Sequence, residues 1–172
     1  PQKSSGEDNI SMFLLKIISN EIIDPLIHLF NLSFKTGYIP QNYKCAKVVP
    51  IYKAGEKNRF NNYRPISLLS AFGKVLEKIV AIQMLKFLDQ NKILYSHQYG
   101  FCPGHDTTQP LLNLMKKIYD NLNKATSEYT INIFLNLAKA FDVLDVNILL
   151  KKLEHYGFKN DALKWLSGLK VT

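Results

Sequence analysis

Residues 129–137 read Tyr-Thr-Ile-Asn-Ile-Phe-Leu-Asn-Leu and have the period of two that is typical of a β-strand. One face carries only large apolar side chains: Tyr129, Ile131, Ile133, Leu135 and Leu137. The other face carries Thr130, Asn132, Phe134 and Asn136. This is the clearest strand of the chain, and helical patterns lie on both sides of it. Few strands among many helices favour an α+β fold whose sheet is left incomplete.

Apolar residues at helical spacing predict the helices. We expect helices over residues 10–19, 25–35, 70–90, 108–123 and 145–155, and one more from residue 160. Asp24-Pro25 is expected to begin the second of these, because proline suits the first helical position. Residues 44–52 have strand character, but Pro50 cannot donate a backbone hydrogen bond, so we expect an edge strand or an end there.

Composition limits the class of protein. The chain has 172 residues, of which 47% are hydrophobic and 21% charged, enough for one domain with a core and too apolar for intrinsic disorder. Two cysteines, Cys45 and Cys102, make no disulfide framework, and with four histidines they show no metal-ligand spacing. No apolar run approaches the roughly 18 residues that span a bilayer. We therefore expect an intracellular protein with no membrane partner.

The basic residues are concentrated in one segment. The formal net charge is +8, and residues 44–64 hold six basic side chains against the single acid Glu56. Aromatic rings are interleaved with these cations, at Tyr43, Tyr52, Phe60 and Tyr63. Cations that contact phosphate and rings that contact bases or sugars are typical of nucleic-acid binding. A solvated loop with a few anchoring aromatics would look the same, so both interpretations stay open.

Four colinear motifs show a resemblance to a known family. They are Val-Pro-Ile-Tyr-Lys-Ala-Gly at residues 49–55, Asn-Tyr-Arg-Pro-Ile-Ser-Leu-Leu at 62–69, Gln-Tyr-Gly-Phe at 98–101, and Phe-Leu-Asn-Leu-Ala-Lys-Ala-Phe-Asp at 134–142. In order and spacing they resemble the reverse transcriptase domain of non-LTR retrotransposons of the jockey-like kind. The resemblance runs from Lys3 to about Leu166.

The resemblance implies an RNA-directed DNA polymerase, a nucleotidyltransferase that holds two Mg²⁺ ions on palm aspartates. Its partners would be an RNA template, a DNA primer or RNA–DNA hybrid, and a dNTP, and the nucleus would be a plausible location. Residues 1–128 would be fingers-like and residues 129–172 the start of the palm. The family's second catalytic motif, Tyr-x-Asp-Asp, does not occur in the chain. We therefore expect the fingers and first part of the palm of a right-hand polymerase, truncated before that motif.

Candidate site residues follow from the same resemblance. Lys53 and Arg64 correspond to cations that contact the dNTP triphosphate, and a guanidinium suits bidentate phosphate binding. Phe141 corresponds to the ring that stacks on the dNTP sugar. Gln98, Tyr99, Gly100 and Phe101 correspond to the segment under the template. A loop-anchoring salt bridge for Arg64, a core role for Phe141 and an ordinary turn at residues 98–101 are the alternatives.

Departures from the family pattern point to an inactive chain. Asn136 stands where the family has its first metal-binding aspartate, and an amide brings no negative charge to Mg²⁺. Asp142 and Asp145 are interpreted as a turn acid and a helix N-cap. We expect no productive Mg²⁺ binding. The alternatives to an inactive polymerase fragment are a non-catalytic nucleic-acid-binding module and a protein-interaction domain that self-associates through an exposed palm edge.

Overall fold

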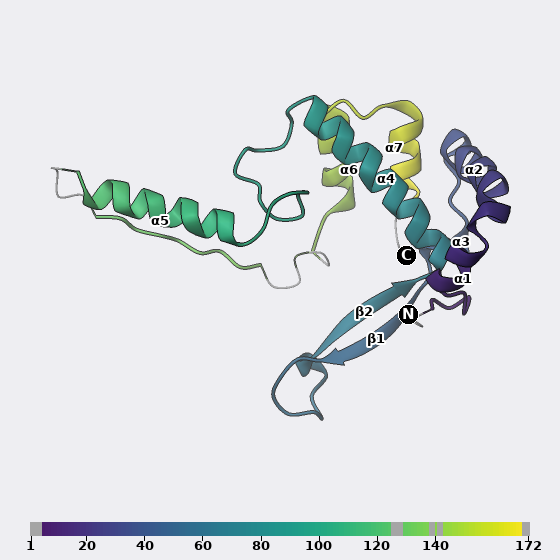
Figure 1. Cartoon of the computed structure of the whole chain (residues 1–172), viewed down its shortest axis with the longest axis horizontal. Coiled ribbons are helices and arrows are strands. Elements are labelled where there is room, and N and C mark those ends of the chain that lie inside the picture. The colour runs from purple at the N-terminus through teal and green to yellow at the C-terminus, as the bar shows by residue number, and fades with distance from the viewer. Residues whose placement is uncertain (1–4, 125–128, 138–139, 141–142, 170–172) are drawn as a thin grey trace. The chain divides into compact units, whose positions relative to one another are not determined.

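The computed structural model describes residues 5–124, 129–137, 140 and 143–169. In chain order its elements are α1 (Met12–Ile17), α2 (Ser19–Thr36), α3 (Gln41–Lys44), β1 (Ala46–Tyr52), β2 (Tyr63–Leu69), α4 (Ala71–Gln90), α5 (Thr108–Leu122), α6 (Val146–His155) and α7 (Asn160–Ser167). This mixture of helices and a small antiparallel sheet confirms the α+β class (Figure 1). The chain divides into two compact units, Pro1–Leu85 with Asp145–Thr172, and Lys86–Leu144.

The sheet is an antiparallel hairpin of β1 and β2, in which Tyr52 lies opposite Tyr63 and Pro50 opposite Pro65. The Lys53 amide donates to the Asn62 carbonyl at 2.8 Å, so residues 53 and 62 are a hydrogen-bonded pair. Pairs alternate along an antiparallel ladder, which puts Pro50 and Pro65 at a pair that exchanges no hydrogen bonds. β1 therefore continues through Pro50 as an edge strand.

Helix α2 begins earlier than predicted. It starts at Ser19 and contains Pro25, so the prediction that Asp24-Pro25 begins a helix is wrong. Ile22 and Phe30, on either side of the proline, line one cavity of about 560 Å³. Packing of a single apolar stripe therefore keeps the helix continuous where proline removes a backbone donor. The end of α2 follows expectation, because Gly37 is left-handed (φ 71°) and its amide donates to the Ser33 carbonyl.

Side chains cap the N-termini of α4 and α6, and the cap predicted at Asp145 is confirmed. The Ser70 hydroxyl accepts from the Gly73 amide at 3.0 Å, directly before α4. The Asp145 carboxylate accepts from the amides of Asn147 and Ile148 at 2.8 and 3.2 Å and begins α6. Among the described helices, none is long and apolar enough to cross a bilayer.

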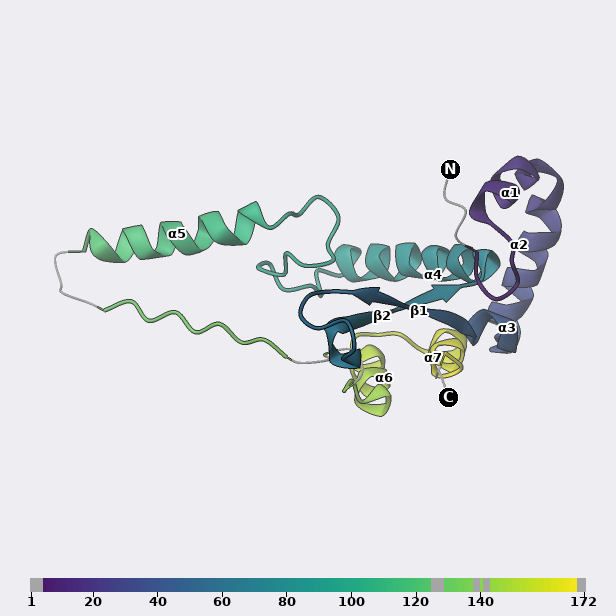
Figure 2. The same cartoon turned by 90° about the horizontal axis from the view of Figure 1, so that it is seen from below.

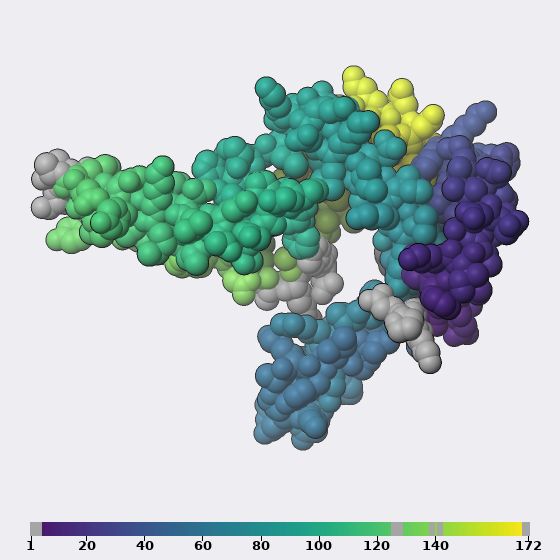
Figure 3. Space-filling view, in the orientation of Figure 1, coloured from purple at the N-terminus to yellow at the C-terminus, as the bar shows by residue number. Residues whose placement is uncertain are grey.

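Residues 129–137 form no strand, so that prediction is wrong. They run as an extended segment beside α5, with the Asn121 amide donating to the Thr130 hydroxyl at 3.3 Å (Figures 2 and 3). Their side chains are open to solvent: Tyr129 is 97% exposed and Leu135 is 89% exposed. Within the described residues β1 and β2 pair only with each other, so the segment has no partner strand. A strand pattern without a partner gives an extended chain.

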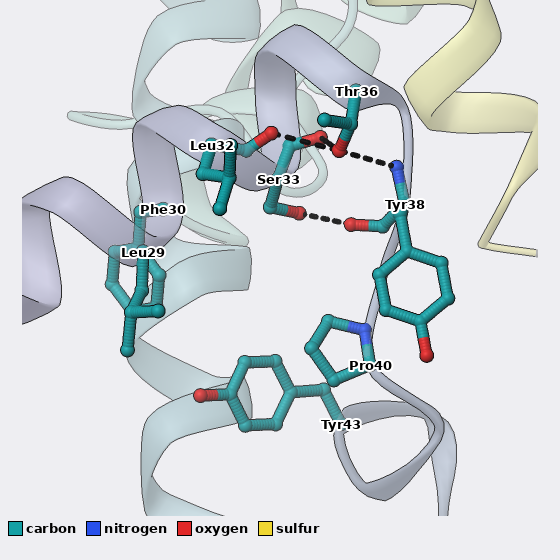
Figure 4. A pocket seen from close by; sticks show the side chains of 8 residues that line it. All are labelled: Leu29, Phe30, Leu32, Ser33, Thr36, Tyr38, Pro40 and Tyr43. Atoms are coloured by element: carbon teal, nitrogen blue, oxygen red, sulfur yellow. Dashed lines mark hydrogen bonds between the residues drawn. The ribbon is translucent and has the colours of Figure 1, made fainter.

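The core of the first unit joins α2, α4 and α7. Its fully buried apolar residues are Phe30, Ile39, Leu76 and Trp165. The Trp165 indole donates to the Ser33 hydroxyl at 2.9 Å, and that hydroxyl donates to the Tyr38 carbonyl at 2.6 Å (Figure 4). The buried polar groups are thereby satisfied, and the segment after α2 is fixed against α7.

Candidate functional site

The hairpin brings two predicted site residues onto one face. Lys53 follows β1 directly, and Arg64 is the second residue of β2, opposite Ile51. Side chains alternate between faces, so Lys53, Ile51 and Arg64 share a face, with Lys53 and Arg64 on the diagonal. Diagonal neighbours have Cβ atoms about 7–8 Å apart. Both side chains are exposed, so one phosphate group could be contacted from two strands.

The turn at residues 53–62 is held by hydrogen bonds to its own backbone. The hydroxyls of Tyr52 and Tyr63 donate to the carbonyls of Gly55 and Lys57, respectively. The Asn62 side chain donates to the Glu56 carbonyl at 2.8 Å. The two tyrosine rings meet edge to face with centroids 5.6 Å apart. These two rings therefore anchor the loop, which was the alternative to contact with bases.

Some charged side chains of the turn at residues 53–62 interact with residues in or beside the same turn. Arg59 Nε lies 2.8 Å from Glu56 Oε2, and this is the single ion pair found in the part of the chain that the structure describes. The Lys57 ammonium lies 5.8 Å from the centre of the Tyr52 ring. Phe60, by contrast, is 94% exposed. In the described residues, Lys53 and Arg64 have no acidic partner, so their charge is directed to solvent.

Tyr43, in helix α3, is another of the aromatic residues that the sequence suggested for nucleic-acid contact, and it packs on the protein instead. Tyr43 belongs to the partly buried residues packed on the core, and burial raises the pKa of its hydroxyl. It also lines a cavity of about 420 Å³ (Figure 4). Tyr43 is therefore a packing residue.

The predicted template segment lies in the second unit, within the loop that joins α4 to α5. The Gln98 side chain donates to the Gly100 carbonyl at 2.9 Å, and the Tyr99 hydroxyl accepts from the Asn113 amide. Phe101 is 90% exposed and has a positive φ of 61°. The Asp106 carboxylate accepts from the amides of Thr108 and Gln109 at 2.9 and 3.2 Å. Its charge therefore serves the start of α5.

Among the described residues, those near the predicted metal position do not fit a divalent metal site. Asn136 is exposed on the unpaired segment and offers a neutral amide. No group of three or more histidine, cysteine, aspartate or glutamate side chains that could hold a metal occurs among the described residues. The Asp145 carboxylate is used as a helix cap. Hard cations require several oxygen ligands with negative charge. Phe141 and Asp142 lie outside the described residues.

A family model described as reverse transcriptase (RNA-dependent DNA polymerase) matches residues 51–170, which include the end of β1, the turn, β2 and the loop before α5. The chain belongs to this reverse transcriptase family. Among similar proteins, a probable RNA-directed DNA polymerase from transposon BS of Drosophila melanogaster is 32% identical over 82% of this chain and 16% of its own length. The RNA-directed DNA polymerase from mobile element jockey of the same organism is 28% identical, over 82% and 15%.

A third relative matches nearly the whole chain. It is a retrovirus-related Pol polyprotein from type-1 retrotransposable element R1 of Bradysia coprophila, 29% identical over 99% of this chain and 17% of its own length. The chain thus spans about one sixth of the length of these relatives, and the names place it among non-LTR retrotransposon reverse transcriptases, as the motifs indicate.

Sequence reasoning missed three rings near the template segment. Tyr95 contacts His97, and Tyr99 contacts both His97 and His105, so these rings form a series. The available signal is the alternation of rings at positions 95, 97 and 99, of which the Gln-Tyr-Gly-Phe motif includes only Tyr99.

Proposed function

We propose that this chain supplies the nucleotide- and template-contacting part of a retrotransposon RNA-directed DNA polymerase. Residues 1–128 would form its fingers and residues 129–172 the beginning of its palm. The observation that carries the proposal is the hairpin register, because it puts Lys53 and Arg64 on one exposed face. The match of this segment to the reverse transcriptase family supports the same assignment.

The hairpin cations would bind the triphosphate of a dNTP and the backbone of a nucleic acid. Lys53 supplies a point charge, and Arg64 a planar fork that can donate two parallel hydrogen bonds to one phosphate. Residues 98–101 would lie against the template strand. Phe141 is proposed as the ring beside the dNTP sugar, and Asn136 as the position of the first palm ligand, where its amide would give Mg²⁺ weak support if any.

Binding to a single-stranded oligonucleotide at several salt concentrations tests the proposal. We expect weak binding with little sequence preference and a steep salt dependence, because neutralised phosphates release counterions. Lys53→Gln and Arg64→Gln should each reduce the slope of log affinity against log salt by about 0.7. Lys78→Gln, which removes an exposed cation from α4, is the matched control and should leave the slope unchanged. An unchanged slope in the two hairpin variants would refute the assignment.

The exposed segment at residues 129–137 favours a second function, protein interaction through self-association. It contains no charge and no proline, and its large side chains are open to solvent. Such a segment can pair with another copy of itself. A nuclear location, which the family implies, stays a prediction that microscopy of a tagged chain would check.

A further inference from the structure

Four rings in the loop before α5 form a continuous series of contacts. The ring centroids of Tyr95 and His97 are 5.2 Å apart, those of His97 and Tyr99 are 6.4 Å apart, and those of Tyr99 and His105 are 5.6 Å apart. The last two contacts are edge to face, at interplanar angles of 90° and 78°. We call Tyr95, His97, Tyr99 and His105 the ring series.

Hydrogen bonds to α5 fix the far half of the ring series. The Asn113 side chain donates to the Tyr99 hydroxyl, and Gln109 Oε1 lies 2.5 Å from His105 Nδ1. At the other half, the Ser96 hydroxyl lies 3.1 Å from His97 Nδ1. The rings are thus held in place within the second unit, although they lie on a loop. Rings fixed before binding lose little conformational entropy when a ligand stacks on them.

The ring series is exposed rather than packed in a core. Tyr95 is 73% exposed, His97 and His105 are exposed, and only Tyr99 is half-buried. None of the four belongs to the buried cluster of the protein. Aromatic rings that only stabilise a fold normally bury their faces. Here three of the four side chains are open to solvent.

We propose that the ring series is a stacking surface for unpaired nucleobases, with Tyr95 as its outermost ring. The inference rests on the proposed function, because it names how the loop before α5 would hold a single strand. Stacking on aromatic rings tolerates every base, which suits a template-contacting surface. This adds Tyr95, His97 and His105 to the residues taken from family motifs.

The experiment measures fluorescence anisotropy of two labelled oligonucleotides of equal length, oligothymidylate and its abasic counterpart. The abasic strand keeps the phosphates and removes the stacking faces. We expect Tyr95→Ala to weaken oligothymidylate binding by about 5- to 100-fold and to leave abasic binding unchanged. Tyr95→Phe should bind like the native chain, because stacking needs only the ring. Tyr119→Ala, a change at a 68% exposed tyrosine on α5, is the matched control.

Each outcome decides something different. Equal binding of the two oligonucleotides by the native chain, or equal affinities for Tyr95→Ala and Tyr119→Ala, would overturn the stacking surface and leave the hairpin proposal intact. Binding of neither oligonucleotide would overturn both proposals. Selective loss of oligothymidylate binding in Tyr95→Ala, with rescue by Tyr95→Phe, supports the inference. If the rings instead stacked on a protein partner, the native chain would bind oligothymidylate and the abasic strand with equal affinity.

Discussion

Two regions of this chain have strand character, the β1–β2 hairpin and residues 129–137, and among the described residues only the hairpin forms paired strands. The partner of β1 begins directly after the turn at residues 53–62, so the loop that must close is short and its entropy cost is small. Residues 129–137 have the stronger pattern, and the part of the chain that the structure describes holds no strand next to them in sequence. Alternation therefore predicts the capacity to pair, while the position of a partner decides whether pairing occurs.

The two regions also differ in whether their open edges offer backbone hydrogen-bond donors to a further strand. Pro50 and Pro65 lie opposite each other at a pair without mutual hydrogen bonds, where backbone donors point outward. Proline lacks that donor, so each outer edge of the hairpin is interrupted in the same place. Residues 129–137 contain no proline, glycine or charge. The paired region is protected against a third strand, and the unpaired region is open to one.

The largest effect we predict concerns Asn136 in the unpaired region. Neither this chain nor its Asn136→Asp variant should extend a primer on an RNA template, because one restored carboxylate does not make a two-metal site. In a polymerase completed with the remaining palm and thumb of a relative, aspartate should exceed asparagine at this position by on the order of a thousandfold in rate. Primer extension by the native 172-residue chain, or equal rates in the completed enzyme, would contradict this account.

Hydrogen exchange should separate the two regions directly. Ladder amides such as Ile51 and Arg64 are expected to be protected at least on the order of 100-fold more than amides at residues 129–137. Mass spectrometry of peptides from both regions checks this, with the α4 peptide as a protected reference. Comparable protection in both regions would show that residues 129–137 have found a partner strand in solution.

Much of the fold follows from local signals that the sequence carries in full. Ser70, Asp145 and Gly37 end or begin helices through contacts within a few residues, so their patterns predict the boundaries. Pro25 misleads, because packing of α2 on both sides of it overrides the local preference. The ring series and the shared face of Lys53 and Arg64 depend on loop geometry and register. A local sequence pattern determines neither the loop geometry nor the register, so these two features could not be predicted from it.

A charge placed in each region tests which one drives association. Ile133→Lys should weaken self-association by about tenfold or more, because like charges would then face each other across a pair of copies. Val48→Lys is the matched control, since Val48 is 58% exposed on a strand that is already paired. Sedimentation velocity at several concentrations measures both. A native chain that sediments as a monomer throughout would refute self-association.

The smallest predicted effect lies in α4, the helix that follows β2 directly. Burial raises the pKa of the Glu77 carboxyl, so the folded state binds its proton more tightly than the unfolded chain does. The stability that this proton contributes is present below the ordinary glutamate pKa of 4.5 and is lost as pH rises through the folded pKa. Glu77→Gln should therefore be slightly more stable than the native chain at pH 7, by at most about 0.5 kcal/mol because the side chain is largely exposed. The advantage of Glu77→Gln should shrink as pH falls toward 4.5. Thermal melts of both proteins across that pH range measure it, with Glu21→Gln as an exposed control. A difference in stability that does not change with pH would contradict the argument.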